Sequence, residues 1–304
     1  MSTSLGVAGL VLHFRTPDHT LTCVQSLVSE GVRRIVLVDN SEDQGVSLRM
    51  MDAGLAELRR AGVQLDLLEP GHNLGFGAGV AEGLRALAYG AAMHVLLINS
   101  DATLVPDSLP SMVRMLETHS VVVPLHSAHD TLAGSSSFKR YRPLFALLYP
   151  CPPHRGHTTI PSGCCVLIRA DQRRMDFFDR DFFFYGEDIM LGFDLAQRGL
   201  GVAECSAATV VHAGSASARN GSLFYEYHMA RAHWLLARKL ARNRVEFAAF
   251  IAMRCLTLSL RASLRSARGR SLLPWRGLLL ATRDVLQGRR RSLTPAAAAS
   301  PERA

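Results

Sequence analysis

Over about the first 125 residues, short apolar runs alternate with stretches whose apolar residues recur at helical spacing. The apolar runs predict β-strands at residues 9–14, 35–38, 63–68, 94–98 and 121–124. The stretches with helical spacing predict helices at residues 20–29, 47–61, 78–89 and 109–117. Strands that alternate with helices form a mostly parallel sheet covered by helices on both faces, so we expect an α/β fold.

The pattern becomes irregular in the middle of the chain. Residues 128–161 are rich in Ser, Gly, Pro and His without a sustained period, which predicts a long mobile segment that can close over a bound ligand. Two further strands, at 164–168 and 201–212, flank a predicted helix at 189–197. We therefore expect one sheet-containing domain over residues 1–240.

The last part of the chain is helical and basic. Helical spacing recurs at residues 224–242, 245–264 and 272–287, and the Arg-, Ala- and Pro-rich end at 289–304 predicts disorder. Residues 238–304 contain 15 Arg or Lys against three acids, a net +12, which leaves −4 of the total +8 for the remainder. We expect the extension at 241–288 to dock on an anionic membrane surface. The alternative is that it packs on the body or forms a homodimer, with its arginines solvated.

Composition limits the class of protein. The chain has 304 residues, 48% apolar and 20% charged, which is typical of a packed globular protein. Its best candidate for a membrane span, 247–260, is interrupted by Arg254 and is shorter than the roughly 18 residues that a span needs. The N-terminus lacks a signal-peptide pattern, and six scattered cysteines without a CxxC motif indicate a reducing compartment. We expect a cytoplasmic protein, peripheral on the inner face of the plasma membrane.

Four predicted strands end in polar or glycine-rich residues. These ends contain His13, then Asp39, then the glycine-rich stretch 73–79 with Asn73 and Gly75, and then Asn99-Ser100-Asp101. Ligands of open parallel sheets bind beyond the carboxyl ends of the strands, so four such ends favour a binding site over coincidence. Each end taken alone is equally compatible with a plain turn, because Asp, Asn and Gly are turn residues.

Acidic and imidazole side chains at other predicted ends add possible chemistry. Asp101 is placed to hold Mg²⁺ or Mn²⁺ beside a phosphate-binding loop, since hard divalent ions take oxygen ligands. The pair Glu187-Asp188 follows an aromatic run, a setting that tunes a general base, although acids are also favoured in the first turn of a helix. His212 ends an apolar strand, where a neutral imidazole can ligate a metal.

Together these motifs resemble the family 2 glycosyltransferases of the GT-A fold, in their rhamnosyltransferase-like branch. The matching stretches, in order, are Val-Asp-Asn-Ser at 38–41, Asn-Leu-Gly-Phe-Gly-Ala-Gly at 73–79, Leu-Ile-Asn-Ser-Asp-Ala at 97–102, Ser-Gly at 162–163, Phe-Asp at 178–179 with Phe-Phe at 182–183, Tyr-Gly-Glu-Asp at 185–188 and Val-His at 211–212. The resemblance covers residues 7 to 240. It implies a Rossmann-like, mostly parallel sheet followed by a helical C-terminal segment.

The resemblance also implies roles for individual residues. His13, Asp39, Asn73, Gly75, Asn99 and Ser100 would bind the nucleotide sugar, Asp101 and His212 the divalent metal, and Asp188, with Glu187 beside it, would act in catalysis. Asn99 replaces the first acid of the Asp-x-Asp position, as is usual in this branch. The third acid after the Glu-Asp pair is replaced by Met190, and a usual arginine by Asp194, so the acceptor stays open.

We therefore expect an inverting glycosyltransferase that moves a sugar, with rhamnose as the candidate, from a nucleotide-diphosphate donor to a saccharide or lipid-linked acceptor in cell-surface polysaccharide synthesis. Asp188 would take the acceptor proton while the metal neutralises the leaving diphosphate. One alternative is a catalytically weak relative that only binds nucleotide sugar. Another is a basic protein that binds anions or nucleic acid; we expect no nucleic-acid partner, because the body is net acidic and the basic segment has few aromatic residues beyond Trp275.

Overall fold

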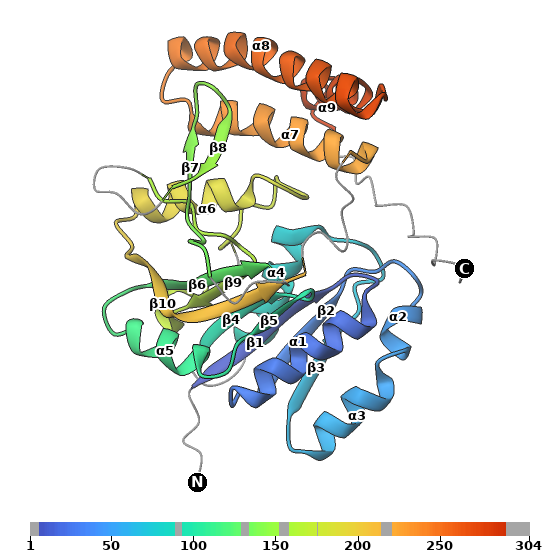
Figure 1. Cartoon of the computed structure of the whole chain (residues 1–304), viewed down its shortest axis with the longest axis vertical. Helices are drawn as coiled ribbons and strands as arrows, with labels where there is room; N and C mark the ends of the chain where they lie inside the picture. The colour runs from blue at the N-terminus through green and yellow to red at the C-terminus, as the bar shows by residue number, and fades with distance from the viewer. Residues whose placement is uncertain are drawn as a thin grey trace. The chain divides into compact units, whose positions relative to one another are not determined.

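The computed structural model describes residues 6–88, 93–128, 134–151, 158–174, 176–213 and 221–289. The chain forms two compact units (Figure 1). The first consists of Met1–Arg142 and Leu147–Gly214, and the second of Pro143–Ala146 and Ser215–Ala304.

The first unit is built on an eight-stranded sheet in the order β3-β2-β1-β4-β9-β6-β10-β5. Its strands are β1 (Val7–His13), β2 (Arg34–Asp39), β3 (Gln64–Leu68), β4 (His94–Asn99), β5 (Ala102–Leu104), β6 (Val121–Ala128), β9 (Cys165–Ile168) and β10 (Val202–His212). The strands β1 to β4 are parallel, as are β6 and β10, whereas β9 runs antiparallel to β4 and β6, and β5 to β10. The prediction of a mostly parallel α/β sheet is confirmed.

Helices cover both faces of this sheet, and the two hydrophobic cores lie between (Figure 1). On one face lie α1 (Pro17–Ser29), α2 (Val46–Arg49), α3 (Asp52–Arg60) and α5 (Ser108–Met115); on the other lie α4 (Phe76–Ala88) and α6 (Glu187–Gln197). A 3-10 turn spans Ala170–Gln172. The predicted helix at 47–61 is two helices, yet Leu48, Met51 and Leu55 all point into the same core, so the amphipathic pattern persists across the interruption.

The irregular segment predicted at 128–161 contains a β-hairpin. Its strands are β7 (Lys139–Arg142) and β8 (Leu147–Pro150), which pair antiparallel. These strands are short and mix basic, aromatic and apolar residues, so no period of two is visible in the sequence. Residues 129–133 and 152–157 lie outside the described residues, and the predicted closure of this segment stays a prediction.

The strand β6 continues four residues past the predicted end at Pro124. Pro124 pairs with Cys205 of β10, but the next residue, Leu125, pairs with Thr209, so β10 contains a bulge at this point. A proline has no N–H to donate to a ladder, and a bulge is where a strand accommodates it. Beyond the bulge the pairing resumes, and it places His126 opposite Val210.

The second unit consists of α7 (Leu223–Leu240), α8 (Arg244–Gly269) and α9 (Leu273–Leu286), with α7 packed against both other helices (Figure 1). Ser222 and Asn243 cap α7 and α8 by accepting backbone N–H bonds of 3.2 and 2.8 Å. Tyr227 and Leu258 belong to the small apolar core between the helices. The sequence groups residues 224–240 with the sheet domain, whereas these residues pack with α8 and α9.

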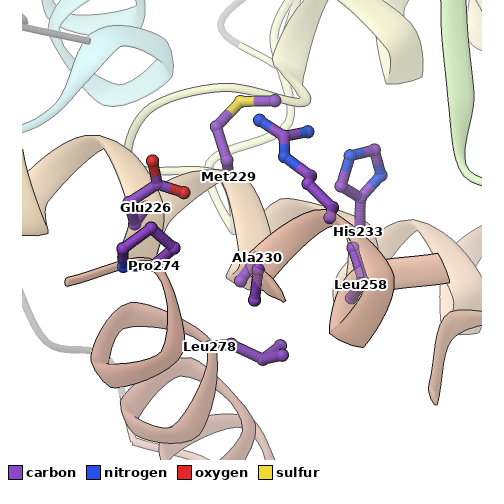
Figure 2. A pocket seen from close by; sticks show the side chains of 9 residues that line it. Glu226, Met229, Ala230, His233, Leu258, Pro274 and Leu278 are labelled. Carbon is purple, nitrogen blue, oxygen red and sulfur yellow. The ribbon is translucent and has the colours of Figure 1, made fainter. Parts of the chain in front are cut away.

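Buried charges tie the three helices together. Arg254 has no exposed surface and donates from Nε to the His233 carbonyl at 2.6 Å. The Arg265 guanidinium donates to buried Glu226 at 2.6 Å, and the Tyr227 hydroxyl donates to buried Asp284 at 2.9 Å. Figure 2 shows the small pocket that remains between these helices; Glu226 and His233 line it together with apolar side chains such as Leu258 and Leu278.

The helix α8 is longer than the apolar run that the sequence suggests. By length and composition alone it could cross a membrane, and among the described residues no other helix meets that criterion. Only 22% of its apolar stretch is buried in the protein. The predicted disordered tail falls on residues 290–304, which lie outside the described residues, apart from Arg289 at its start.

Candidate active site

The ends of β2 and β3 form one hydrogen-bonded cluster. Asp39 ends β2, is 8% exposed, and accepts the Ser41 N–H at 2.9 Å. The neighbouring Asn40 reaches the glycine-rich loop, where its side-chain amide donates to the Gly75 carbonyl at 3.2 Å. In that loop the Asn73 side chain accepts the Gly75 N–H at 2.8 Å. The structure therefore joins Asn73 and Gly75 to the end of β2 through Asn40, the neighbour of Asp39. The contact of Asp39, Asn73 and Gly75 with a nucleotide stays a prediction.

Gly75 sits where no other residue fits. Its φ of +79° lies in the left-handed region, and an added Cβ would come within 2.6 Å of the Phe183 carbonyl oxygen. The next residue, Phe76, begins α4 and donates its N–H to that same carbonyl at 2.9 Å. The glycine-rich loop is thus fastened to the aromatic segment that precedes Glu187 and Asp188.

His13 is the one predicted binding residue whose side chain is enclosed. Its ring has no exposed surface, and its two nitrogens contact the Thr20 hydroxyl at 2.7 Å and the Ser47 hydroxyl at 2.8 Å. Burial lowers the pKa of this imidazole. With both nitrogens bonded inside the protein, the His13 ring joins the end of β1 to α1 and α2 and has no nitrogen left for a nucleotide.

Asn99 ends β4, and Ser100 and Asp101 form the turn between β4 and β5; all three residues are partly exposed. The Asp101 carboxylate lies 3.1 Å from Nε2 of His212, and the Asp101 carbonyl accepts the N–H of Ala213. The antiparallel pairing of β5 with β10 places Ala102 opposite His212 and so fixes this contact. The two predicted metal ligands are therefore neighbours.

Two further donors, which the sequence reasoning missed, lie beside His212. His126 on β6 and Cys164, just before β9, join His212 in a cluster whose ligand atoms all lie within 4.8 Å of one another. Nε2 of His126 is buried without a hydrogen-bond partner, and burial with the nearby His212 lowers the pKa of His126 to about 4. A neutral imidazole with an open nitrogen is a suitable metal ligand, so the residues present fit a divalent ion.

Glu187 and Asp188 begin α6 after a strained turn. Tyr185 and Gly186 both have positive φ, of 64° and 93°, and a left-handed tyrosine is the kind of strain found at functional sites. The N–H of Gly163 donates to Asp188, and burial raises the pKa of that carboxyl against the opposing charge of Lys139. Burial and the Asp188 charge raise the pKa of Glu187 to about 8, and its Oε2 has no hydrogen-bond partner.

These three groups of residues lie along one edge of the sheet. Cys164 links them, since its carbonyl accepts the N–H of Asn99 at 2.8 Å. Burial raises the pKa of its thiol, and the nearby charges of Asp101 and Asp188 add to this effect. The edge therefore combines a glycine-rich loop at a helix N-terminus, a carboxylate–imidazole pair and a carboxyl group of raised pKa. Those are the elements of anion binding, metal binding and proton transfer.

A GT-A-type sheet with these side chains at its carboxyl edge is the architecture of nucleotide-sugar transferases. The chain belongs to the "Glycosyltransferase like family 2" family, whose profile matches residues 7–237. No curated protein sequence matches the chain.

Solved structures with the same fold include three glycosyltransferases of low sequence identity. GalNAc-T7, crystallised with UDP, GalNAc and Mn²⁺, has 13% identity and a TM-score of 0.56 over 78% of this chain and 48% of its own. The mannosyltransferase PcManGT from Pyrobaculum calidifontis, in complex with GDP-Man and Mn²⁺, has 13% identity and a TM-score of 0.54 over 93% and 88%. S. aureus TarS has 14% identity and a TM-score of 0.53 over 83% and 42%. The chain thus spans about half the length of GalNAc-T7 and less of TarS, but most of the mannosyltransferase.

Proposed function

We propose that this protein is an inverting glycosyltransferase that uses a nucleotide-diphosphate sugar as donor. The observation that carries the proposal is the placement, at one sheet edge of a family 2 chain, of Asp188 beside Gly163 and of Asp101 beside His212. GalNAc-T7 was crystallised with UDP, GalNAc and Mn²⁺, and the mannosyltransferase PcManGT with GDP-Man and Mn²⁺. These ligands support a nucleotide-sugar donor and a divalent ion, Mg²⁺ or Mn²⁺, for this protein.

Each part of the edge then has a task. Asp39, Asn73, Gly75, Asn99 and Ser100 line the donor, and the N-terminal turn of α4 lies toward its diphosphate, with N–H groups after Phe76 as donors because the Phe76 N–H is bonded to the Phe183 carbonyl. Asp101 and His212 hold the divalent ion, which when bound stabilises negative charge on the leaving diphosphate. The proposed base, Asp188, accepts the proton of the acceptor hydroxyl as that oxygen attacks the anomeric carbon.

The raised pKa of Asp188 fits this task, because a base must hold the proton that it takes. Its neighbour Glu187 is buried at 9% exposure and is the second candidate. For the sugar we propose rhamnose first, and for the acceptor a saccharide or lipid-linked glycan of cell-surface polysaccharide; both rest on the resemblance of the motifs.

A panel of nucleotide sugars tests the proposal. Full-length protein is incubated with each donor, with Mn²⁺ or Mg²⁺ or with EDTA, and release of nucleoside diphosphate is measured with and without glycan acceptors. We expect one donor to be consumed only with metal. Calorimetry should show that Asp101→Ala weakens nucleoside-diphosphate binding in Mn²⁺ but not in EDTA. Tight metal-dependent nucleotide binding without turnover on any donor would instead identify a nucleotide-sugar-binding relative.

We propose further that the second unit docks on an anionic membrane surface at the cytoplasmic face. The outer side of α8 exposes Leu256, Leu260 and Leu264, a row at i, i+4 spacing that Arg268 continues. Each of the three carboxylates among the described residues of this unit has a partner. Glu226 pairs with Arg265, Glu246 pairs with Arg242, and Asp284 accepts a hydrogen bond from Tyr227. The other exposed charges among residues 221–289 are therefore positive.

The geometry of α8 favours lying on a membrane over crossing it. Its inner side carries Arg254, fully buried, and Arg265, paired with Glu226, so that side is committed to α7. An apolar outer row flanked by arginines is the arrangement of an interfacial helix. Each arginine near an anionic leaflet contributes about 1 kcal/mol, so the attachment depends on salt.

Flotation with vesicles of phosphatidylcholine, with and without phosphatidylglycerol, tests this attachment. We expect binding to anionic vesicles at low salt, release at high salt, and loss in Leu256→Ser/Leu260→Ser. Met50→Ser, which removes an exposed apolar side chain of the first unit, serves as the matched control. Wild-type protein that stays unbound at low salt would show that α8 does not attach to a membrane. A dimer that dissociates in the double variant would show that a second copy of the chain covers α8.

A further inference from the structure

We propose that His126 and Cys164 complete the metal site, and that the site therefore prefers a borderline divalent ion such as Zn²⁺ or Co²⁺ over Mg²⁺. The inference rests on the proposed function only for its location, since it concerns the ion held by Asp101 and His212. The resemblance assigns those two residues; it assigns neither His126 nor Cys164.

The geometry of the cluster supports the proposal. A ligand atom from each of His126, Cys164 and His212 lies within 4.8 Å of the other two. The two imidazole rings stand edge to face, with centroids 6.3 Å apart, so they do not stack. His212 also contacts Asp101 at 3.1 Å, so this carboxylate bonds one member of the cluster without itself belonging to it.

The second observation is an unsatisfied buried atom. Nε2 of His126 is inaccessible to solvent and has no hydrogen-bond partner. A buried polar group without a partner is destabilising, and an ion is one way to satisfy it. Two hydrogen bonds to Ser135 fix the backbone of His126. The His126 N–H donates to the Ser135 carbonyl at 2.9 Å, and the His126 carbonyl accepts the Ser135 N–H at 2.6 Å.

The backbone also explains why these donors come together. The β10 bulge lets β6 run past Pro124, which carries His126 to the sheet edge where β10 ends in His212. Cys164 precedes β9, the antiparallel strand between β4 and β6, and its side chain is 6% exposed. Three strands thus deliver one donor each to the same edge.

The chemistry of the donors sets the preference for the ion. Two imidazoles and a thiol suit Zn²⁺ and Co²⁺, because thiolate and imidazole are softer ligands than the oxygens that Mg²⁺ requires. The ion binds Cys164 as a thiolate, so one proton leaves the thiol for the solvent as the metal–sulfur bond forms. The competing explanation is that Cys164 is only a packed core residue, like its neighbour Cys165.

Cobalt spectroscopy separates these explanations without any measurement of sugar transfer. Full-length protein is stripped with EDTA, desalted under reducing conditions and titrated with Co²⁺ alone. We expect a thiolate-to-cobalt charge-transfer absorption that is absent in Cys164→Ser and retained in Cys165→Ser, a variant of the adjacent buried cysteine. His126→Ala should weaken Co²⁺ and Zn²⁺ affinity by about tenfold or more while leaving Mg²⁺ affinity unchanged.

Wild-type protein that lacks the charge-transfer absorption, or a Cys164→Ser variant that keeps it, overturns the inference. Circular dichroism checks that each variant folds, and Cys164→Ala replaces Cys164→Ser if the serine is not tolerated in the core. Cobalt binding as expected with no donor consumed would refute only the proposed function. Mg²⁺-dependent transfer with no cobalt–thiolate absorption would refute only this inference.

Discussion

The two units of this protein both bury charged side chains, but they use them differently. In the helical unit, three of the buried charges make hydrogen bonds that join the helices: Arg254 donates to a carbonyl, Glu226 accepts from Arg265, and Asp284 accepts from Tyr227. In the sheet unit, Glu187 keeps an unpartnered oxygen and a pKa raised to about 8, and Asp188 has a raised pKa in spite of a nearby lysine.

The difference separates structural charges from functional ones. A buried charge with its hydrogen bonds made holds helices in one arrangement, whereas a buried carboxyl that is costly to ionise is available for proton transfer. The comparison predicts that removing the first kind lowers stability, and that removing the second kind lowers activity without lowering stability.

The largest expected effect is on catalysis. Asp188→Asn removes the proposed base without changing the shape of the side chain, so we expect transfer to fall about 1,000-fold while donor binding persists. Steady-state turnover and calorimetry with the nucleotide measure the two. Asp194→Asn, on the exposed side of the same helix, is the control and should retain wild-type turnover. Near-normal turnover by Asp188→Asn would transfer the role to Glu187.

The matching change in the helical unit acts on stability. Arg254→Ala leaves a cavity and frees the carbonyl of His233, so we expect about 3 kcal/mol of destabilisation in urea. Arg254→Met keeps most of the volume and should lose less, which separates packing from hydrogen bonding. The exposed Arg268→Met serves as the surface control. If Arg254→Ala were as stable as Arg268→Met, the buried guanidinium would not organise these helices.

A change that moves the base without removing it tests the geometry of the sheet unit. An added Cβ at Gly163 would lie 2.3 Å from the Asp188 carboxylate, so Gly163→Ala must displace that oxygen. We expect transfer to fall about 100-fold, the usual cost of such a misplacement. Gly269→Ala, where the added carbon meets nothing, is the control. Wild-type turnover with a displaced carboxylate in a crystal structure would argue against Asp188 as the base.

The smallest effect concerns Glu187 and pH. Its folded-state pKa of about 8 is above its ordinary 4.5, so its protonated form stabilises the fold at low pH and that contribution is lost as pH rises from about 4.5 to 8. Glutamine does not ionise, so the Glu187→Gln variant does not lose stability as pH rises. We expect its free energy of unfolding to exceed that of wild type by about 1–3 kcal/mol at pH 8 and to be nearly the same as that of wild type at pH 5. Urea unfolding at both values measures the difference; a constant difference would contradict the raised pKa.

Local sequence patterns predicted the parallel part of the sheet and the residues at its strand ends. Asp39 and Asn73 follow apolar runs and are themselves turn residues, so the sequence signal and the structure coincide. The same signal could not reveal that His13 is enclosed, because the partners that bury its ring, Thr20 and Ser47, are 7 and 34 residues away.

The metal side of the site was harder to predict because it depends on pairing between distant strands. Pro124 is a valid stop signal for a strand, and only the bulge in β10, some 80 residues later, lets β6 continue to His126. Cys164 gave no signal either, since buried cysteines in an apolar run, such as the neighbours Cys164 and Cys165, are typical of a core.

The contact between Gly75 and Phe183 has a kinetic consequence. The loop that we propose for the donor and the segment that leads to Asp188 share a hydrogen bond at 2.9 Å and leave no room for a side chain between them. Neither can move without the other, so admission of the donor resets the position of the base. We therefore expect an ordered sequence in which the nucleotide sugar binds before the acceptor and the nucleotide leaves last, so that nucleoside diphosphate competes with the donor but not with the acceptor.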